Sequence, residues 1–330
     1  MAFSIIKPGL LDTIQDMGRK GYGNWGINPG GVMDRYAAHV ANILVGNCNE
    51  EAVLEIHFPG PQILFEQNTL IAITGADFSP TVNDQVIPRW QPVVVRKNTV
   101  LHFPQLVQGS RCYISVHGGY CVEKWLESYS TNLRAGSGGW DGRALKKGDE
   151  LPFKENTIYF AGLLKEESNY EILPWRVNTE KVYRYPHEIG FIPGHEYGRL
   201  SPSSQASFLE NNFMIHPSSD RMGYQLKGPS LSLDQPLELV SSAVSYGTVQ
   251  LLPSGQLIVL MADHQTTGGY PRIAHVISAH LPKLAQLRPC DVIQFKRMDT
   301  DGAEALVIAQ QKELHILQRA CMDHLNELVC

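Results

Sequence analysis

The chain has 330 residues, which is enough for two compact domains that each bury a core of their own. Charged residues make up 18% of the chain and hydrophobic residues 43%, as in an ordinary globular protein. The formal net charge is -5 and there is no long basic run, so nucleic-acid binding is not expected.

The sequence also gives no sign of membrane attachment or export. Its longest apolar runs, such as residues 257–262, are far shorter than the roughly 20 residues that a spanning helix needs. Residues 1–11 include Lys7 and Pro8 and have neither the apolar core nor the cleavage site of a signal peptide. The six cysteines are scattered without a CxxC pair, which favours free thiols in a reducing compartment. We therefore expect a cytoplasmic protein.

The first predicted helix follows Asp34, whose side chain can cap a segment that runs to Leu44. Gly46 is placed to end that helix. A second helix is predicted near the C-terminus, where Asp301 and Glu304 have the spacing of a capping box. Beyond it, aliphatic residues and one cysteine form a helical stripe: Leu306, Leu314, Leu317, Cys321 and Leu325.

Most of the remaining chain is predicted to form short strands, because 29 glycines and 20 prolines suit many tight turns. The predicted strands are rich in β-branched residues and bounded by turn formers; they include residues 69–74, 92–95, 112–116 and 257–261.

One pattern occurs three times: a turn is followed by a short stretch with strand-like alternation of side chains, and the stretch ends in phenylalanine. It covers residues 98–103, 148–153 and 290–295, and in each copy an aliphatic residue and the phenylalanine lie two apart, on one face of a strand. A common turn-and-strand device explains this pattern, and a duplicated β-barrel is the alternative. The stretch 174–184, with Pro, Asn, Thr and several charges, is the expected junction between domains 1–180 and 181–330.

Several familiar motifs are absent or match only formally. Residues 21–26 fit GxGxxG but continue into more loop, whereas a dinucleotide site needs a strand before the glycines and a helix starting within them. Gly223 and Gly228 have P-loop spacing, but Pro229 stands where the lysine should be. There is no HExxH, no close His/Asp cluster and no GxSxG, so neither a metal site nor a serine hydrolase is predicted.

Three glycine-containing polar loops carry the strongest chemical signal: residues 12–21, 219–224 and 261–271. In the last of these, Thr266, Thr267 and two glycines follow a predicted strand, so backbone amides and hydroxyls can converge on an oxyanion. Asp263 and Gln265 lie two apart and can face one pocket. A plain hairpin, held by threonine bonds to the backbone, is the alternative.

Five blocks in order carry a resemblance that spans nearly the whole chain: residues 13–19, 142–149, 219–224, 247–250 and 263–271. On these blocks the chain resembles the biotin-dependent carboxyltransferase-like family, also called the allophanate hydrolase subunit 2 family, which includes the C subunit of 5-oxoprolinase. The sequence departs from the family pattern at Glu127 (usually Gly), at His280 (usually Asp) and at Cys290 (usually Gly).

The resemblance implies a mainly β fold with two cyclophilin-like β-barrel domains and a few peripheral helices. It also implies a heteromer, in which this chain joins the B subunit and the A subunit of 5-oxoprolinase to open 5-oxoproline to glutamate with ATP and Mg²⁺. Two alternatives come from other relatives. One is the carboxyltransferase component of a biotin-dependent urea or allophanate system; the other is a non-catalytic regulator that binds a kinase-inhibitor-like partner.

For the 5-oxoprolinase reaction, Asp263, Gln265 and Thr267 are the predicted catalytic residues. The predicted substrate-binding residues are Arg221, Gln250, Thr266, Tyr270, Asp16 and Arg19. Arg221 suits a substrate carboxylate because a guanidinium binds it through two hydrogen bonds, and Gln250 and the two threonines can donate to the activated oxygen. Asp16 and Arg19 either join this site or pair with each other to shape the N-terminal loop. No protein ligand to a metal is assigned.

Overall fold

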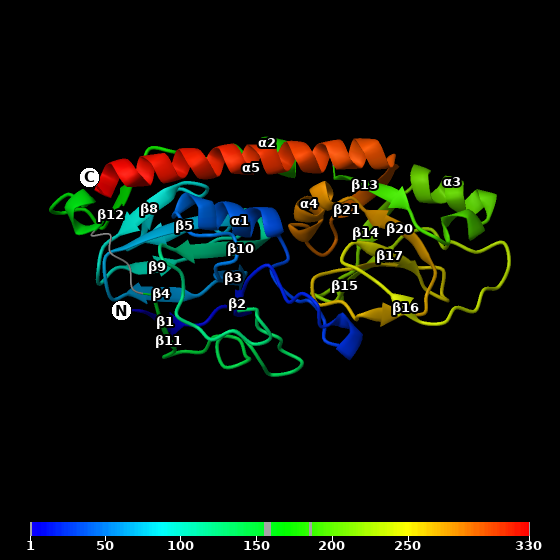
Figure 1. Ribbon diagram of the computed structural model, residues 1–330, viewed down its shortest axis with the longest axis horizontal. Helices are drawn as coiled ribbons and strands as arrows, with labels where there is room; N and C mark the ends of the chain where they lie inside the picture. The colour runs from blue at the N-terminus through cyan, green and yellow to red at the C-terminus, as the bar shows by residue number, and fades with distance from the viewer. Residues whose placement is uncertain (1, 155–159, 185–186, 330) are drawn as a thin grey trace. The chain divides into compact units, whose positions relative to one another are not determined.

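A computed structural model describes residues 2–154, 160–184 and 187–329, and Figure 1 shows its course. The chain divides into two compact units. The first comprises Met1–Arg19, Asp34–Asn178 and Lys312–Cys330, and the second comprises Lys20–Met33 and Thr179–Gln311. Over the described chain as a whole, strands contain more residues than helices, so the prediction of a mainly β chain is confirmed.

The first unit contains two six-stranded sheets. One has the order β11-β1-β4-β9-β6-β7, with strands β11 (Glu150–Pro152), β1 (Ala2–Lys7), β4 (Gln62–Phe65), β9 (Val100–His102), β6 (Thr81–Val82) and β7 (Gln85–Val86). The other has the order β12-β8-β5-β10-β3-β2, with strands β12 (Tyr170–Ile172), β8 (Pro92–Val95), β5 (Thr69–Asp77), β10 (Gln108–Val116), β3 (Val53–His57) and β2 (Asp12–Gln15). Side chains from both sheets fill one core, so the sheets face each other. A short 3-10 turn, η2 (Phe160–Leu163), also belongs to this unit.

Helix α1 (Arg35–Leu44) packs on strands β5 and β10 of this unit. Asp34 accepts a hydrogen bond from the amide of Ala37 at 2.9 Å, and Gly46 follows the helix with a φ of 75°. Both predicted ends of this helix are therefore confirmed, because its signals are local: a capping carboxylate and a glycine that tolerates left-handed backbone.

The second unit is built around a closed barrel with the order β13-β20-β17-β18-β15-β14-β21. Its strands are β13 (Glu188–Pro193), β20 (Arg272–Val276), β17 (Thr248–Leu251), β18 (Leu257–Leu260), β15 (Gly223–Lys227), β14 (Asn212–Ile215) and β21 (Val292–Arg297). A separate two-stranded ribbon joins β16 (Ser242–Ala243) to β19 (Thr267–Gly268). The prediction of a β-barrel is confirmed in this unit.

Short helices surround the barrel, and α3 packs on β21. The helical elements of this unit are η1 (Gly23–Trp25), α2 (Glu180–Tyr183), η3 (Tyr197–Arg199), α3 (Pro202–Glu210), η4 (Ser278–His280) and α4 (Leu281–Ala285). Four phenylalanines from α3 and the barrel strands, namely Phe191, Phe208, Phe213 and Phe295, lie with ring centroids 4.5 to 6.0 Å apart.

The repeated turn-and-strand pattern places its side chains as predicted. In all three copies the aliphatic residue and the phenylalanine are buried together; the pairs are Leu101 and Phe103, Leu151 and Phe153, and Ile293 and Phe295. The first two pairs belong to the core of the first unit and the third to the barrel core.

Helix α5 (Thr300–Val329), red in Figure 1, is the long C-terminal helix. It begins one residue before Asp301, and the amide of Gly302 donates to Asp299 Oδ1 at 2.8 Å. The predicted capping box at Asp301 is therefore wrong, because Asp299 already supplies the capping oxygen. Leu314, Cys321 and Leu325 of the predicted stripe are buried, whereas Leu306 is exposed.

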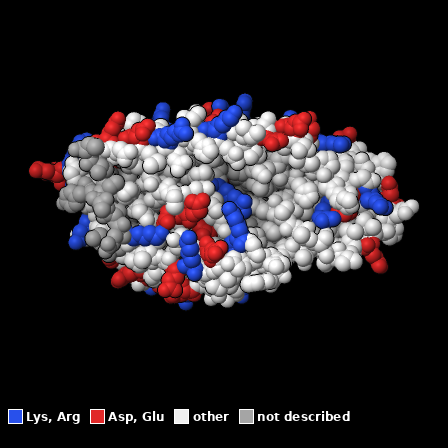
Figure 2. Space-filling model, in the orientation of Figure 1, with Lys and Arg blue, Asp and Glu red and all other residues white. Residues whose placement is uncertain are grey.

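The face of the molecule in Figure 2 carries charges of both signs. Figure 2 shows acidic and basic side chains interspersed on the visible face, in keeping with the small net charge of -5. Across the described residues, none of the helices is both long enough and apolar enough to cross a membrane.

Candidate functional site

Arg221 and Asp263 are brought together by the pairing of β15 with β18. Gly223 of β15 lies opposite Leu260 of β18, so the chain that precedes β15 runs beside the chain that follows β18. Backbone hydrogen bonds continue past the strand ends, from Met261 N to Met222 O at 3.0 Å and from Asp263 N to Arg221 O at 2.8 Å. The two predicted site loops therefore meet at one rim of the barrel.

The side chains of these two residues form a bidentate ion pair. Arg221 Nε donates to Asp263 Oδ2 at 2.8 Å and Nη2 donates to Oδ1 at 3.1 Å. Nη2 also donates to the carbonyl of Gly31 at 2.6 Å, and the side chain of Arg221 is only 8% exposed. The carboxylate of Asp263 is 21% exposed, so it is held in one orientation yet can still be reached from solvent.

This pairing bears on the role predicted for Arg221. Asp263 and the carbonyl of Gly31 already accept hydrogen bonds from Nε and Nη2 of the guanidinium. Binding of a substrate carboxylate by Arg221 stays a prediction, and in this arrangement Arg221 positions Asp263.

Three polar side chains line the rim beside the pair. Gln250 of β17 is fully buried, and its Nε2 donates to the carbonyl of Tyr270 at 3.4 Å. Gln265 Nε2 donates to Gln250 Oε1 at 3.5 Å, and His264 Nδ1 lies 2.5 Å from the carbonyl of Gln265. The amides of Gln250 and Gln265 thus form a short chain from the barrel wall to an exposed loop.

At Gly268 the chain passes close to the side chain of Gln250. A Cβ on Gly268 would lie 2.6 Å from Gln250 Nε2, closer than two such atoms can approach. By contrast, a Cβ on Gly269 would meet nothing nearer than Ser241 Oγ at 3.4 Å. Gly268 therefore constrains the position of the buried side-chain amide of Gln250, whereas Gly269 does not.

Thr267 and Gly268 form β19 and pair with Ala243 and Ser242, so the end of this loop is a two-stranded ribbon. Thr267 and Tyr270 are exposed and Thr266 is half-buried. The donor roles of Thr266 and Thr267 stay predictions.

Asp16 and Arg19 belong to the first unit, unlike the other seven predicted site residues. Asp16 accepts hydrogen bonds from Ser128 Oγ at 2.7 Å, Ser130 Oγ at 2.6 Å and the amide of Tyr129 at 2.6 Å. Arg19 donates to the carbonyl of Ser130, and its guanidinium lies 4.5 Å from the ring centroid of Trp125. Both side chains therefore organise the segment around residues 125–130.

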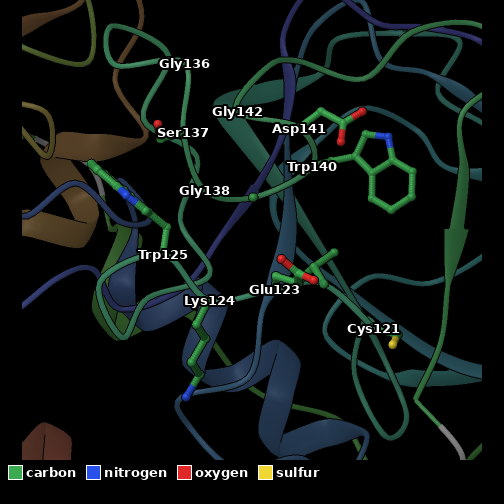
Figure 3. A pocket seen from close by; sticks show the side chains of 12 residues that line it. Cys121, Glu123, Lys124, Trp125, Gly136, Ser137, Gly138, Trp140, Asp141 and Gly142 are labelled. Atoms are coloured by element: carbon green, nitrogen blue, oxygen red, sulfur yellow. The ribbon is translucent and has the colours of Figure 1, made fainter.

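That segment borders a pocket of about 430 Å³ within the first unit, shown in Figure 3. The pocket is lined by Cys121, Val122, Glu123, Lys124, Trp125, Gly136, Ser137, Gly138, Gly139, Trp140, Asp141 and Gly142. This pocket was not predicted from the sequence. The signal was present in the glycine run 136–142, which lies directly before the resemblance block at 142–149.

Comparison with known proteins places the chain in a family. Residues 25–297 match the family described as carboxyltransferase domain, subdomain A and B. The chain belongs to this family. The family resemblance drawn from the five sequence blocks is therefore confirmed.

Two similar relatives are bacterial proteins that are each named as the C subunit of 5-oxoprolinase. The one from Haemophilus influenzae is 36% identical over 95% of this chain and 96% of its own length. The one from Escherichia coli is 35% identical over 97% of this chain and 98% of its own length. As their name says, these relatives are subunits.

The fold is also found inside a larger enzyme. The crystal structure of the K. lactis urea amidolyase matches 96% of this chain with a TM-score of 0.84 and 29% identity. This chain corresponds to only 20% of that protein.

Proposed function

We propose that this chain is the C subunit of an ATP-dependent 5-oxoprolinase, which acts in the cytoplasm with the A and B subunits to convert 5-oxoproline to glutamate. The observation that supports this most is end-to-end similarity: the two bacterial proteins of that name match this chain over 95% and 97% of its length and over nearly all of their own.

The barrel rim provides chemistry that suits opening a lactam. ATP, when bound, would supply the phosphoryl group that, on the lactam oxygen, makes the ring carbonyl carbon more open to attack by water. Asp263, fixed by Arg221, would accept a proton from the attacking water. The side-chain amides of Gln250 and Gln265, with the hydroxyls of Thr266 and Thr267, would donate to the oxygen on which charge develops. The ring nitrogen takes up a proton as its bond to the carbonyl carbon breaks, and it becomes the amine of glutamate. A second water then hydrolyses the acyl phosphate that remains, which releases phosphate and leaves the side-chain carboxylate.

The described residues do not by themselves fit a Mg²⁺ ion at this rim. Arg221 occupies both oxygens of Asp263, and no group of three or more His, Cys, Asp or Glu side chains comes together in residues 2–154, 160–184 and 187–329. We therefore assign no step to the ion on this chain and propose that ATP and Mg²⁺ are held with the help of a partner subunit.

A second function is supported by the K. lactis structure, whose TM-score is 0.84. Under it, the chain would be the carboxyltransferase component of a biotin-dependent urea or allophanate system. This function requires a biotin carrier as partner and would yield no glutamate from 5-oxoproline.

Reconstitution separates the two functions. The chain is mixed with the candidate A and B subunits, ATP, Mg²⁺ and 5-oxoproline, and glutamate is measured, with each protein omitted in turn. Glutamate that appears only in the complete mixture supports the 5-oxoprolinase. Carboxyl transfer to urea from a biotinylated carrier, with no glutamate in the first mixture, supports the second function instead.

A further inference from the structure

The pocket in the first unit has the features of a built ligand site, and the barrel-rim chemistry does not use it. Its wall is a turn, residues 136–142, in which Gly136, Gly138, Gly139 and Gly142 all have left-handed φ values between 57° and 72°. Residues other than glycine are strained at these φ values. The four glycines therefore allow the turn a backbone conformation that an ordinary loop does not adopt.

The turn is held from behind by side chains of the same unit. A Cβ on Gly138 would lie 2.4 Å from the carbonyl of Ser130 and 2.8 Å from Arg19 Nη2, and one on Gly139 would lie 1.9 Å from Thr131 Oγ1. Asp16 and Arg19 in turn hold the segment that contains Ser130. The turn is therefore pressed against a rigid support, and only glycine permits that contact.

Four successive backbone amides of this turn have no acceptor within the described chain. The amides of Ser137 and Gly142 donate to the carbonyls of Asn132 at 3.2 Å and Gly138 at 2.9 Å. The amides of residues 138–141, which lie between Ser137 and Gly142, donate to no other described group. Consecutive amides at a glycine-rich turn can converge on oxygen atoms that carry negative charge.

Charged side chains of both signs surround the turn. Arg19 is only 4% exposed and lies directly behind Gly138, so its positive charge is poorly screened by solvent. Two carboxylates line the pocket: Asp141 pairs with Arg143 at 3.2 Å, and Glu123 is exposed. In Figure 3 the amine of Lys124 points away from the turn, and Lys124 Nζ lies 4.8 Å from the ring of Tyr129.

Two indoles provide the apolar part of the pocket. Trp125 and Trp140 are both half-buried and lie on opposite sides of the view in Figure 3, with the glycine turn between them. Arg19 covers one face of the Trp125 ring at 4.5 Å and thereby fixes its orientation. Aromatic walls of this kind suit a flat group of a ligand.

We propose that this pocket binds a small carboxylate that carries a flat ring, with the carboxylate on the amides of residues 138–141 and the ring against one of the two indoles, Trp125 or Trp140. Binding is a property of this chain alone and is independent of the reaction proposed above. It requires neither ATP nor a partner protein.

Gly136 offers a matched pair of variants to test this. Its Cβ position is open, with nothing within 4 Å, and its φ of 59° is one that Asp and Asn both tolerate better than other residues. Gly136→Asp would add a negative charge at the pocket, and Gly136→Asn would add a side chain of the same shape without charge. Repulsion over several ångströms should weaken carboxylate binding on the order of tenfold for Gly136→Asp, and Gly136→Asn should stay within about threefold of the unmodified chain.

The experiment is isothermal titration calorimetry of the full chain with 5-oxoproline and with benzoate, each beside its uncharged amide, 5-oxoprolinamide or benzamide. We expect at least one carboxylate to bind more tightly than its amide and to be weakened by Gly136→Asp but not by Gly136→Asn. The proposal is overturned if neither carboxylate binds at millimolar concentration, if acid and amide bind alike, or if both variants bind equally. Should Gly136→Asp fail to fold, the comparison of acid with amide on the unmodified chain decides. Binding of benzoate without 5-oxoproline would support the pocket while counting against 5-oxoproline as its occupant.

Discussion

Arg221 holds Asp263 through two hydrogen bonds, from Nε to Oδ2 at 2.8 Å and from Nη2 to Oδ1 at 3.1 Å. These residues come from loops 42 positions apart and meet because β15 pairs with β18. The pair gives the barrel rim a carboxylate of fixed orientation. We take this carboxylate as the centre of the proposed site.

Replacing Asp263 tests the pair directly. Asp263→Asn keeps the shape of the side chain but removes its charge, and leaves the buried guanidinium of Arg221 without its counter-ion. We expect a loss of stability of about 2 to 4 kcal/mol, because breaking one partner of a poorly exposed pair leaves an uncompensated charge. Denaturant unfolding of the purified chain measures this, and a change below about 0.5 kcal/mol would show that the pair is not energetically coupled.

The two glycines after Thr267 form a second test with its own control. Gly268→Ala would push a methyl group against Gln250 Nε2, which lies in the barrel wall, and should cost roughly 1 to 3 kcal/mol. Gly269→Ala meets only Ser241 Oγ at 3.4 Å and should stay within about 0.5 kcal/mol. Thermal unfolding of both variants under one condition gives the comparison. Equal effects would mean that Gln250 is not fixed by this contact.

Elements with local signals could be predicted from the sequence. Helix α1 has a capping aspartate before it and a glycine after it, and β8 was expected at residues 92–95, where it lies. The pairing of distant segments could not be predicted in this way. Residues 20–33 belong with the C-terminal half and residues 312–330 with the N-terminal half, and such contacts depend on tertiary packing that leaves no local signal.

The site was predictable as a set of residues but not as a geometry. Arg221 and Asp263 both lie in blocks that carry the family resemblance, yet their pairing depends on the register of two strands. Asp16 is of a residue type that is common in functional sites, which is why it was predicted to belong to one. Its hydrogen bonds from Ser128 and Ser130 join positions more than 100 residues apart, and a local sequence pattern does not reveal them. The glycine turn 136–142 was missed because its meaning lies in φ values and in contacts with Ser130 and Thr131.

Positions that depart from the family pattern also gain an explanation. Glu127 and Cys290, where the family resemblance predicts glycine, adopt φ values of 61° and 73°. These turns thus keep the left-handed backbone that glycine favours, at some energetic cost.

Protonation of His280 in acid should lower the stability of the folded chain. Burial lowers the pKa of this imidazole from 6.5 to about 4, and its Nδ1 accepts a hydrogen bond from the amide of Gly190 at 2.8 Å. Because the folded pKa lies below the unfolded one, this contribution to stability is complete above about pH 6.5 and is lost as the pH falls toward 4. His280→Asn retains an acceptor for Gly190 without titrating. The unmodified chain should lose about 2 kcal/mol more than this variant between pH 7 and pH 4.5, measured by urea unfolding; parallel losses would contradict the assignment.

Asp12 has the opposite dependence. Burial raises the pKa of its carboxyl from 3.8 to about 7, and its Oδ1 has no hydrogen-bond partner among the described residues. With a folded pKa above the unfolded one, the contribution of this carboxyl to stability is complete below about pH 4 and is lost as the pH rises through 7. Asp12→Asn keeps an oxygen for the amide of Gly9 and carries no charge. It should stabilise the chain by about 2 to 4 kcal/mol at pH 8 and by far less at pH 4; equal effects at the two pH values would exclude titration as the cause.

The most direct test of the central claim is glutamate formation from 5-oxoproline and ATP in a mixture of this chain with the A and B subunits, run beside Asp263→Asn. Co-purification first establishes that the variant still assembles. The account predicts turnover that requires this chain and falls at least 100-fold in the assembled variant, an interaction worth roughly 2.7 kcal/mol in the transition state. Turnover that is unchanged by Asp263→Asn, or that proceeds without this chain, would contradict it.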